Sequence, residues 1–160
     1  MPTTPPPSAG YAPVGTRQEL PVAPHALPHR TPRELLTLAR RGLEEAAETR
    51  TDGLRYATAH LAALRAAAAV LAARATSAPG RRNRLTSVWA LLVMVAPELN
   101  EWAAYFAAGA ARRAAAEAGI PRVVSAREAD DLLRAAEQFT AVVEVALGLS
   151  YQPVLRELAS

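Results

Sequence analysis

An arginine and a histidine stand five residues apart, at Arg55 and His60, near the start of a long alanine-rich segment. His60 is the only histidine outside the proline-rich first 30 residues. Histidine titrates near neutral pH and can move a proton, and arginine can stabilise the negative charge that builds on a reacting phosphate. The pair could therefore act in RNA chemistry, or it could be a surface arginine and a packed histidine.

Helix geometry bears on the choice between these two interpretations. Five residues along a continuous α-helix change the side-chain direction by about 140°. Arg55 and His60 would then point apart unless the start of the helix is irregular. As the structural alternative, we expect His60 to pack between helices and Arg55 to be solvated or paired with an acidic side chain such as Glu48.

A second group of candidate binding residues is basic. Arg81, Arg82 and Arg84 follow a Ser-Ala-Pro-Gly stretch and should lie on a loop. Such a cluster could hold the phosphates of RNA or of a nucleotide, or it could be a solvated surface loop. Arg112 and Arg113 offer the same two choices on a helix.

The sequence provides no set of side chains for a metal or a cofactor. It has no cysteine, and His25 and His29 are separated by a proline with no third ligand nearby. Asp130 and Asp131 are adjacent, so on a helix they project about 100° apart. No phosphate-binding loop, dinucleotide motif or hydrolase nucleophile motif occurs. We therefore expect no cofactor and no metal.

Composition bounds the class of protein. All 18 basic residues are arginines, and they exceed the acidic residues by only three in a chain of 160. This mild excess permits a nucleic-acid partner without indicating one. The longest apolar run, Val88–Pro97, is about half of the ~20 residues that a membrane span needs, and the N-terminus lacks the pattern of a secretory signal. We expect a cytoplasmic protein that does not enter the membrane.

The N-terminal half is expected to contain a leader and two helices. Residues 1–30 hold eight of the 13 prolines, which predicts a disordered leader. Thr31-Pro-Arg-Glu34 is a capping box that should begin a helix ending near Thr49, with an apolar stripe formed by Leu35, Leu38, Ala39, Leu43 and Ala46. The next helix should run from about Asp52 to Ala75, with an apolar stripe at positions 54, 57, 61, 64, 68 and 71.

Three further helices are expected in the second half. One begins after Thr86 or Ser87 and is apolar on nearly all sides, so it should be buried. Pro97 should either kink this helix or start the next, which ends at Gly119. The last begins at Ser125 and ends at Gly148, and its apolar stripe should consist of Ala129, Leu132, Leu133, Ala136, Phe139, Thr140 and Val143. With no strand predicted, the fold class is all-α: a single up-and-down bundle of about five helices over residues 31–148, with a tail at 149–160 that could form a short helix.

Several short sequence segments resemble those of a known superfamily. They are Arg55-Tyr56, His60-Leu-Ala-Ala-Leu64, Ser87-Val-Trp-Ala-Leu-Leu92, Ala96-Pro-Glu-Leu99, Glu101-Trp-Ala-Ala-Tyr-Phe106, Ala118-Gly-Ile-Pro121 and Ser125-Ala-Arg-Glu-Ala-Asp-Asp131. The chain resembles the HEPN superfamily (higher eukaryotes and prokaryotes nucleotide-binding), and within it an actinobacterial, SAV-type subfamily. The resemblance implies a bundle of four or more helices that is often dimeric. Members range from metal-independent endoribonucleases to inactive interaction or nucleotide-binding modules.

The resemblance leaves two main functions open. Active members share an arginine, four to six spacer residues and a histidine, and Arg55 and His60 have four residues between them. One function is therefore a toxin-like, metal-independent endoribonuclease that uses Arg55 and His60. The other, which we favour, is a non-catalytic module that binds a protein, RNA or a nucleotide. An antitoxin-type binding partner is a third.

We also expect a homodimer. Two helices of the second half carry more large apolar side chains than one face of a small bundle needs, namely Trp89, Met94, Trp102, Tyr105 and Phe106. The resemblance implies the same state.

Overall fold

The computed structural model describes residues 30–74 and 87–150. Within them the elements are α1 (Pro32–Glu48), α2 (Asp52–Arg74), α3 (Val88–Val95), the short 3-10 helix η2 (Pro97–Leu99), α4 (Asn100–Ala108), α5 (Ala110–Glu117) and α6 (Ala126–Ala146). These residues contain no strand, which confirms the predicted all-α bundle. The leader up to residue 29, the loop with Arg81, Arg82 and Arg84, and the tail after Ser150 lie outside the described residues.

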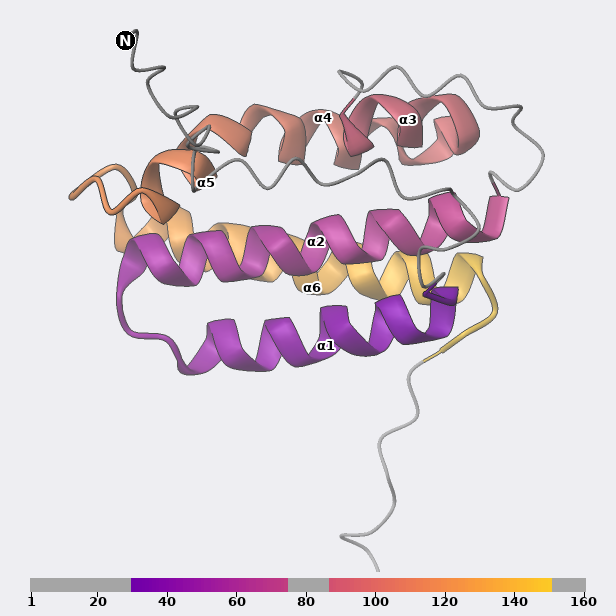
Figure 1. Ribbon diagram of the computed structural model, residues 1–160, viewed down its shortest axis with the longest axis horizontal. Helices are drawn as coiled ribbons and strands as arrows, with labels where there is room; N and C mark the ends of the chain where they lie inside the picture. Colours follow the sequence, from indigo (N-terminus) through magenta and orange to yellow (C-terminus); the bar gives the residue numbers. More distant parts are fainter. Residues whose placement is uncertain (1–29, 75–86, 151–160) are drawn as a thin grey trace, which may run out of the picture.

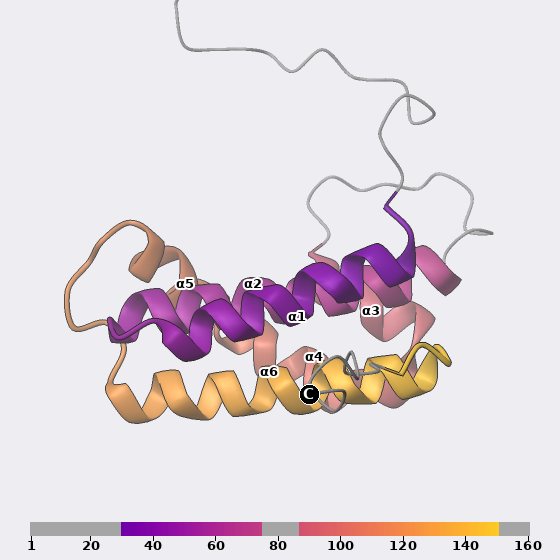
Figure 2. The ribbon, with the colours of Figure 1, turned by 90° about the horizontal axis from the view of Figure 1, so that it is seen from below.

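The helices surround α2. Helices α1 and α2 form an antiparallel hairpin, and α3, α4 and α5 run along the side of α2 that faces away from α1 (Figure 1). Figure 2 shows α6 as a separate layer, parallel to the hairpin. The most extensive packing is between α1 and α2 and between α2 and α6. The core therefore lies where α2, α6 and the α3–α4 segment meet.

Side-chain caps fix the starts of three helices, as the sequence indicates. Thr31, Ser87 and Ser125 each accept a hydrogen bond from the backbone N–H three residues later, at 3.1 Å in each case. At the other end of α6, Gly148 adopts a φ of +67°, a left-handed conformation that glycine adopts without strain. The predicted ends of the first and last helices are confirmed.

Of the six positions predicted to form the buried face of α2, only Ala57 is buried. Leu54 and Leu61 of the expected stripe are exposed, at 56% and 38%. The helix instead buries a broad face of alanines together with Tyr56 and His60. Alanine permits close approach: a Cβ placed on Gly42 of α1 would lie 3.2 Å from the Cβ of Ala62. The small residues of α2, rather than its leucines, thus decide which face the neighbouring helices cover.

Three other sequence expectations need correction. In α1, Ala39, Leu43 and Ala46 of the predicted stripe are buried, but Leu35 and Leu38 are only half-buried and Leu36 is buried instead. Helix α3 is buried on one side only, through Trp89 and Leu92, and its Met94 is 76% exposed. The expected fourth helix is divided: Pro97 opens a 3-10 turn before α4, and the chain bends again at Gly109 before α5.

An aromatic cluster joins α3, α4 and α6. The ring of Phe106 lies 5.1 Å from Trp89 and 5.3 Å from Phe139, measured between ring centroids. Trp102, which is half-buried, stacks on Phe106 and lies 5.7 Å from Phe139. These separations are typical of favourable aromatic pairs. The apolar face predicted for the last helix, which includes Leu132, Phe139 and Val143, is buried against this cluster and α2, as expected.

Among the described residues, one helix is long and apolar enough to cross a membrane by length and composition alone. It is α2, whose best 18-residue window has a mean hydropathy of 1.3. However, 56% of that window is buried inside the bundle, and the core helix of a soluble protein meets the same criterion.

Candidate functional site

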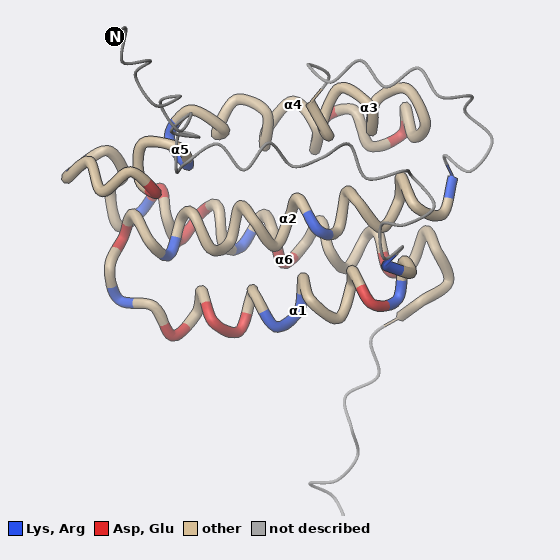
Figure 3. The backbone as a smooth tube through the Cα atoms, in the orientation of Figure 1, with Lys and Arg blue, Asp and Glu red and all other residues tan. Residues whose placement is uncertain are grey.

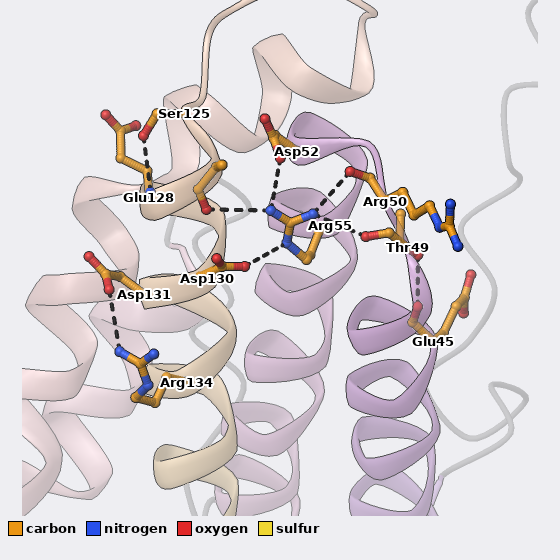
Figure 4. Close-up of polar contacts among 11 residues, drawn as sticks. Glu45, Thr49, Arg50, Asp52, Arg55, Ser125, Glu128, Asp130, Asp131 and Arg134 are labelled. Atoms are coloured by element: carbon orange, nitrogen blue, oxygen red, sulfur yellow. Dashed lines mark hydrogen bonds and ion pairs between the residues drawn. The ribbon is translucent and has the colours of Figure 1, made fainter.

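Arg55 lies in the first turns of α2 and is almost fully buried. Its Nη1 donates to the carbonyl oxygens of Thr49 and Arg50, both at 3.1 Å, in the turn that joins α1 to α2. Its Nη2 donates to Asp52 at 2.8 Å, and its Nε lies 3.0 Å from a carboxylate oxygen of Asp130 in an ion pair (Figure 4). The guanidinium therefore ties the α1–α2 turn to the start of α6.

Arg55 is neither solvated nor paired with Glu48, so both expectations for its side chain were wrong. The acidic side chains that hold it are on α2 and α6, and Glu48 of α1 is not among them. A weaker contact from Nη2 to the carbonyl oxygen of Ala126, at 3.4 Å, adds a second link to α6. Four backbone or carboxylate oxygens lie within 3.1 Å of the guanidinium nitrogens. Each of these nitrogens therefore already has a partner within the protein.

His60 lies one and a half turns further along α2 and is completely buried. Its ring is stacked on Tyr56 with centroids 6.4 Å apart, and it meets Trp89 and Phe106 edge to face at 5.9 and 6.0 Å. Its Nε2 lies 2.8 Å from the carbonyl oxygen of Phe106. The histidine therefore packs between α2, α3 and α4.

The environment of His60 defines its protonation. A carbonyl oxygen only accepts hydrogen bonds, so Nε2 carries the proton and donates. In the neutral ring Nδ1 is then unprotonated, and it has no hydrogen-bond partner within the part of the chain that is described. Burial lowers the pKa of His60 below its ordinary 6.5, although the hydrogen bond to Phe106 opposes this shift. The ring is thus held neutral.

Arg55 and His60 do not share a set of contacts. Arg55 faces the α1–α2 turn and the start of α6, whereas His60 faces α3 and α4. The two hollows found along α1 are lined by neither residue. Their use as a catalytic pair stays a prediction.

Tyr56, between these two residues in sequence, was not singled out by sequence reasoning. Its buried hydroxyl donates a long hydrogen bond, 3.5 Å, to the carbonyl oxygen of Gly109 at the bend between α4 and α5. Burial raises the pKa of Tyr56 above its usual 10.0. The sequence does contain an indication of this contact. Gly109 interrupts an alanine-rich helical segment, and such a glycine indicates that a neighbouring group approaches closely.

The remaining candidates have ordinary partners. Arg112 pairs with Glu128 at 2.9 Å, and Arg113 pairs with Glu117 at 3.0 Å. Asp130 and Asp131 diverge as expected, because the first binds Arg55 and the second faces Arg127 and Arg134. In residues 30–74 and 87–150, no group of three or more histidine, aspartate or glutamate side chains is arranged to hold a metal ion.

Comparison with known proteins gives one match. The family model described as SAV_6107-like HEPN matches residues 46–144, which is more than half of the chain and extends from the end of α1 to near the end of α6. No curated protein and no solved structure matches. The matched region contains Arg55, His60 and the aromatic cluster.

Proposed function

The chain belongs to the SAV_6107-like HEPN family, and from this membership we propose that it is a non-catalytic HEPN module that acts as a homodimer and binds a protein, RNA or a nucleotide. The burial of His60 is the observation that carries the non-catalytic part. A histidine that moves protons for RNA cleavage must reach the ribose 2′-hydroxyl or the leaving oxygen and must titrate near neutral pH. His60 has no exposed surface, and its pKa is lowered by burial.

The occupancy of Arg55 supports the same proposal. An arginine that stabilises a phosphorane presents free N–H groups to the substrate. The Arg55 guanidinium already contacts two backbone carbonyl oxygens and two carboxylates. It would have to leave these partners before it could bind a phosphate, so a structural role fits its contacts better.

Cleavage of RNA tests this part of the proposal. Wild type, Arg55→Ala and His60→Ala are incubated with a mixed RNA pool in EDTA, and the products are analysed for cyclic-phosphate ends. We expect intact RNA in every sample. Cleavage by wild type that both substitutions abolish would instead support the metal-independent endoribonuclease. Because either substitution could unfold the bundle, circular dichroism of each variant accompanies the assay.

The homodimer is supported by exposed apolar side chains. Of the five residues expected to supply the interface, Trp89 and Phe106 are buried in the core. Met94 is 76% exposed, Tyr105 is 45% exposed and Trp102 is half-buried. Val142 and Val145 add exposed apolar surface on α6. Scattered apolar side chains are also common on monomers, so the oligomeric state is established by measuring the mass of the protein in solution.

Light scattering at micromolar concentration tests the dimer. We expect twice the chain mass for wild type and a shift towards the monomer for Met94→Glu combined with Tyr105→Glu. A matched control places two glutamates at Ala111 and Ala118, which are exposed on and just after α5. A monomer mass for wild type would refute the dimer.

Nucleic-acid or nucleotide binding rests on Arg81, Arg82 and Arg84, which lie outside the described residues. Their charge predicts weak, strongly salt-dependent binding. Fluorescence anisotropy with a labelled RNA should show that replacing all three by alanine removes most of the affinity. The matched control replaces the exposed Arg122, Arg127 and Arg134. Binding that survives the loop substitution and raised salt would point to another contact. We also propose that the protein acts in the cytoplasm and has no membrane partner.

A further inference from the structure

Two hollows flank the first half of α1, and the arginines that line them precede the family match at residues 46–144. The larger hollow has a volume of about 800 Å³ and lies between α1 and the end of α6. Figure 2 shows these two segments in different layers of the bundle. The charged and hydroxyl side chains that line the larger hollow are Arg33, Thr37, Arg40, Arg41, Glu44, Glu144 and Ser150.

One wall of the larger hollow is built on a buried ion pair. Glu144 of α6 is only 4% exposed. Arg40 donates from Nε to one of its carboxylate oxygens at 3.2 Å, and Nη2 of Arg40 pairs with the other. A carboxylate withdrawn from water needs such a partner. The two-point contact fixes the Arg40 guanidinium in the wall, and Glu144 offsets its charge, so the positive charge that faces the hollow comes from Arg33 and Arg41.

Two further arginines of this hollow are available to a ligand. The side chains of Arg33 and Arg41 make no hydrogen bond or ion pair with other described residues. Both also line the smaller hollow, which adds Arg30 and Glu34. Arg33 and Arg41 therefore border both hollows.

The charged residues of α1 are distributed along its whole length, as the tube in Figure 3 shows. Arg33 and Glu34 lie in the first turn, Arg40 and Arg41 lie near the middle, and three glutamates lie in the last five residues. Only Arg33 is close enough to the N-terminus for the partial positive charge of the helix end to oppose its own charge.

We propose that this hollow binds a small soluble anion that carries two or three linked phosphate groups. Arg33 and Arg41 are eight residues apart, which is about 12 Å along the axis of α1. Linked phosphates can meet both guanidiniums at once, and each guanidinium fork matches the oxygens of a phosphate. The volume lies in the range of small-ligand sites. Glu44 faces the same hollow and offsets part of the charge, so the affinity should be micromolar rather than nanomolar.

Isothermal titration calorimetry of the full chain with inorganic tripolyphosphate tests the site. We expect saturable binding of one ligand per chain at low salt. A nucleoside triphosphate is the second arm: equal affinity assigns recognition to the phosphates alone, and tighter binding assigns it to a nucleotide. Orthophosphate is the third arm, and affinity equal to that of tripolyphosphate would overturn the requirement for linked phosphates.

Paired variants localise the binding. Arg33→Gln with Arg41→Gln should weaken tripolyphosphate binding at least about tenfold, since two charge-assisted contacts are lost. Arg127→Gln with Arg134→Gln removes the same charge from two exposed arginines of α6 and should leave the affinity unchanged. An equal loss in both double variants, or no saturable binding by wild type at millimolar ligand, would overturn the proposal. All four substituted positions are partnerless or solvent-exposed, so both variants should fold.

Discussion

The Nε2 atom of His60 lies 2.8 Å from the carbonyl oxygen of Phe106, and this hydrogen bond connects the middle of α2 to the end of α4. The same oxygen also accepts a 3.1 Å hydrogen bond from the backbone N–H of Gly109, where the chain bends. His60 therefore adds a second hydrogen bond to a buried carbonyl next to the bend. Its other ring nitrogen, Nδ1, stays without a hydrogen bond among the described residues.

This geometry predicts that stability depends on pH near neutrality. The pKa of His60 is lowered in the folded state by burial, while the unfolded chain keeps a value near 6.5. Below pH 6.5 the unfolded chain binds a proton that the folded chain does not. The free energy of unfolding should therefore be constant above about pH 7.5 and fall as the pH drops through 6.5, by at most about 1.4 kcal/mol per pH unit.

Urea unfolding between pH 5.5 and 8 measures this dependence. His60→Gln keeps an N–H donor but does not titrate, so its stability should vary less with pH in this range. His25→Gln combined with His29→Gln is the matched control, because it removes the other two histidines of the chain. A control that loses the pH dependence, or a His60→Gln variant that keeps all of it, would assign the effect to another group.

Fold prediction from sequence succeeded where one face carries bulky residues and failed where alanine surrounds a helix. In α6, Leu132, Phe139 and Val143 define a single apolar face, and that face is buried. In α2 the alanines occur on all sides, so the periodicity followed Leu54 and Leu61, which are exposed. Burial of α2 depends on how closely its neighbours approach, and periodicity does not contain that information.

The contacts of Arg55 and His60 could be predicted from the sequence only in part. Packing of His60 between helices was one of the two expectations, and its contacts agree with it. The partner Asp130 of Arg55 lies 75 residues further along the chain, so no local pattern indicates the pair. Helix geometry did predict that Arg55 and His60 face different neighbours.

Arg55 should contribute strongly to stability. Arg55→Ala removes two hydrogen bonds to backbone carbonyl oxygens and two ion pairs, and we expect a loss of about 2–4 kcal/mol in urea unfolding. Arg55→Lys should recover only part of it, because an ammonium group cannot reach all these oxygens in their planar arrangement.

Asp130→Asn is the control for the charge alone. The Asp130 side chain is 59% exposed, so its ion pair is screened by water and its loss should cost less than about 1 kcal/mol. Equal costs for Asp130→Asn and Arg55→Ala would mean that the ion pair, and not the bonds to the α1–α2 turn, stabilises this end of the bundle.

Tyr56 and Gly109 are in close contact at the bend between α4 and α5. A Cβ built on Gly109 would overlap the Tyr56 hydroxyl, while the ring carbon that bears it would be 3.5 Å away, an ordinary contact. Gly109→Ala should therefore cost about 1–3 kcal/mol, and Tyr56→Phe, which loses only a long hydrogen bond, about 1 kcal/mol or less. In the double variant the overlap is absent, so it should be more stable than the sum of the two single costs implies, by at least about 1 kcal/mol. Gly53→Ala, whose Cβ would lie 3.5 Å from Ala116, should be neutral or slightly stabilising. Strictly additive costs for Gly109→Ala and Tyr56→Phe would show that crowding by the hydroxyl is not what requires glycine at this bend.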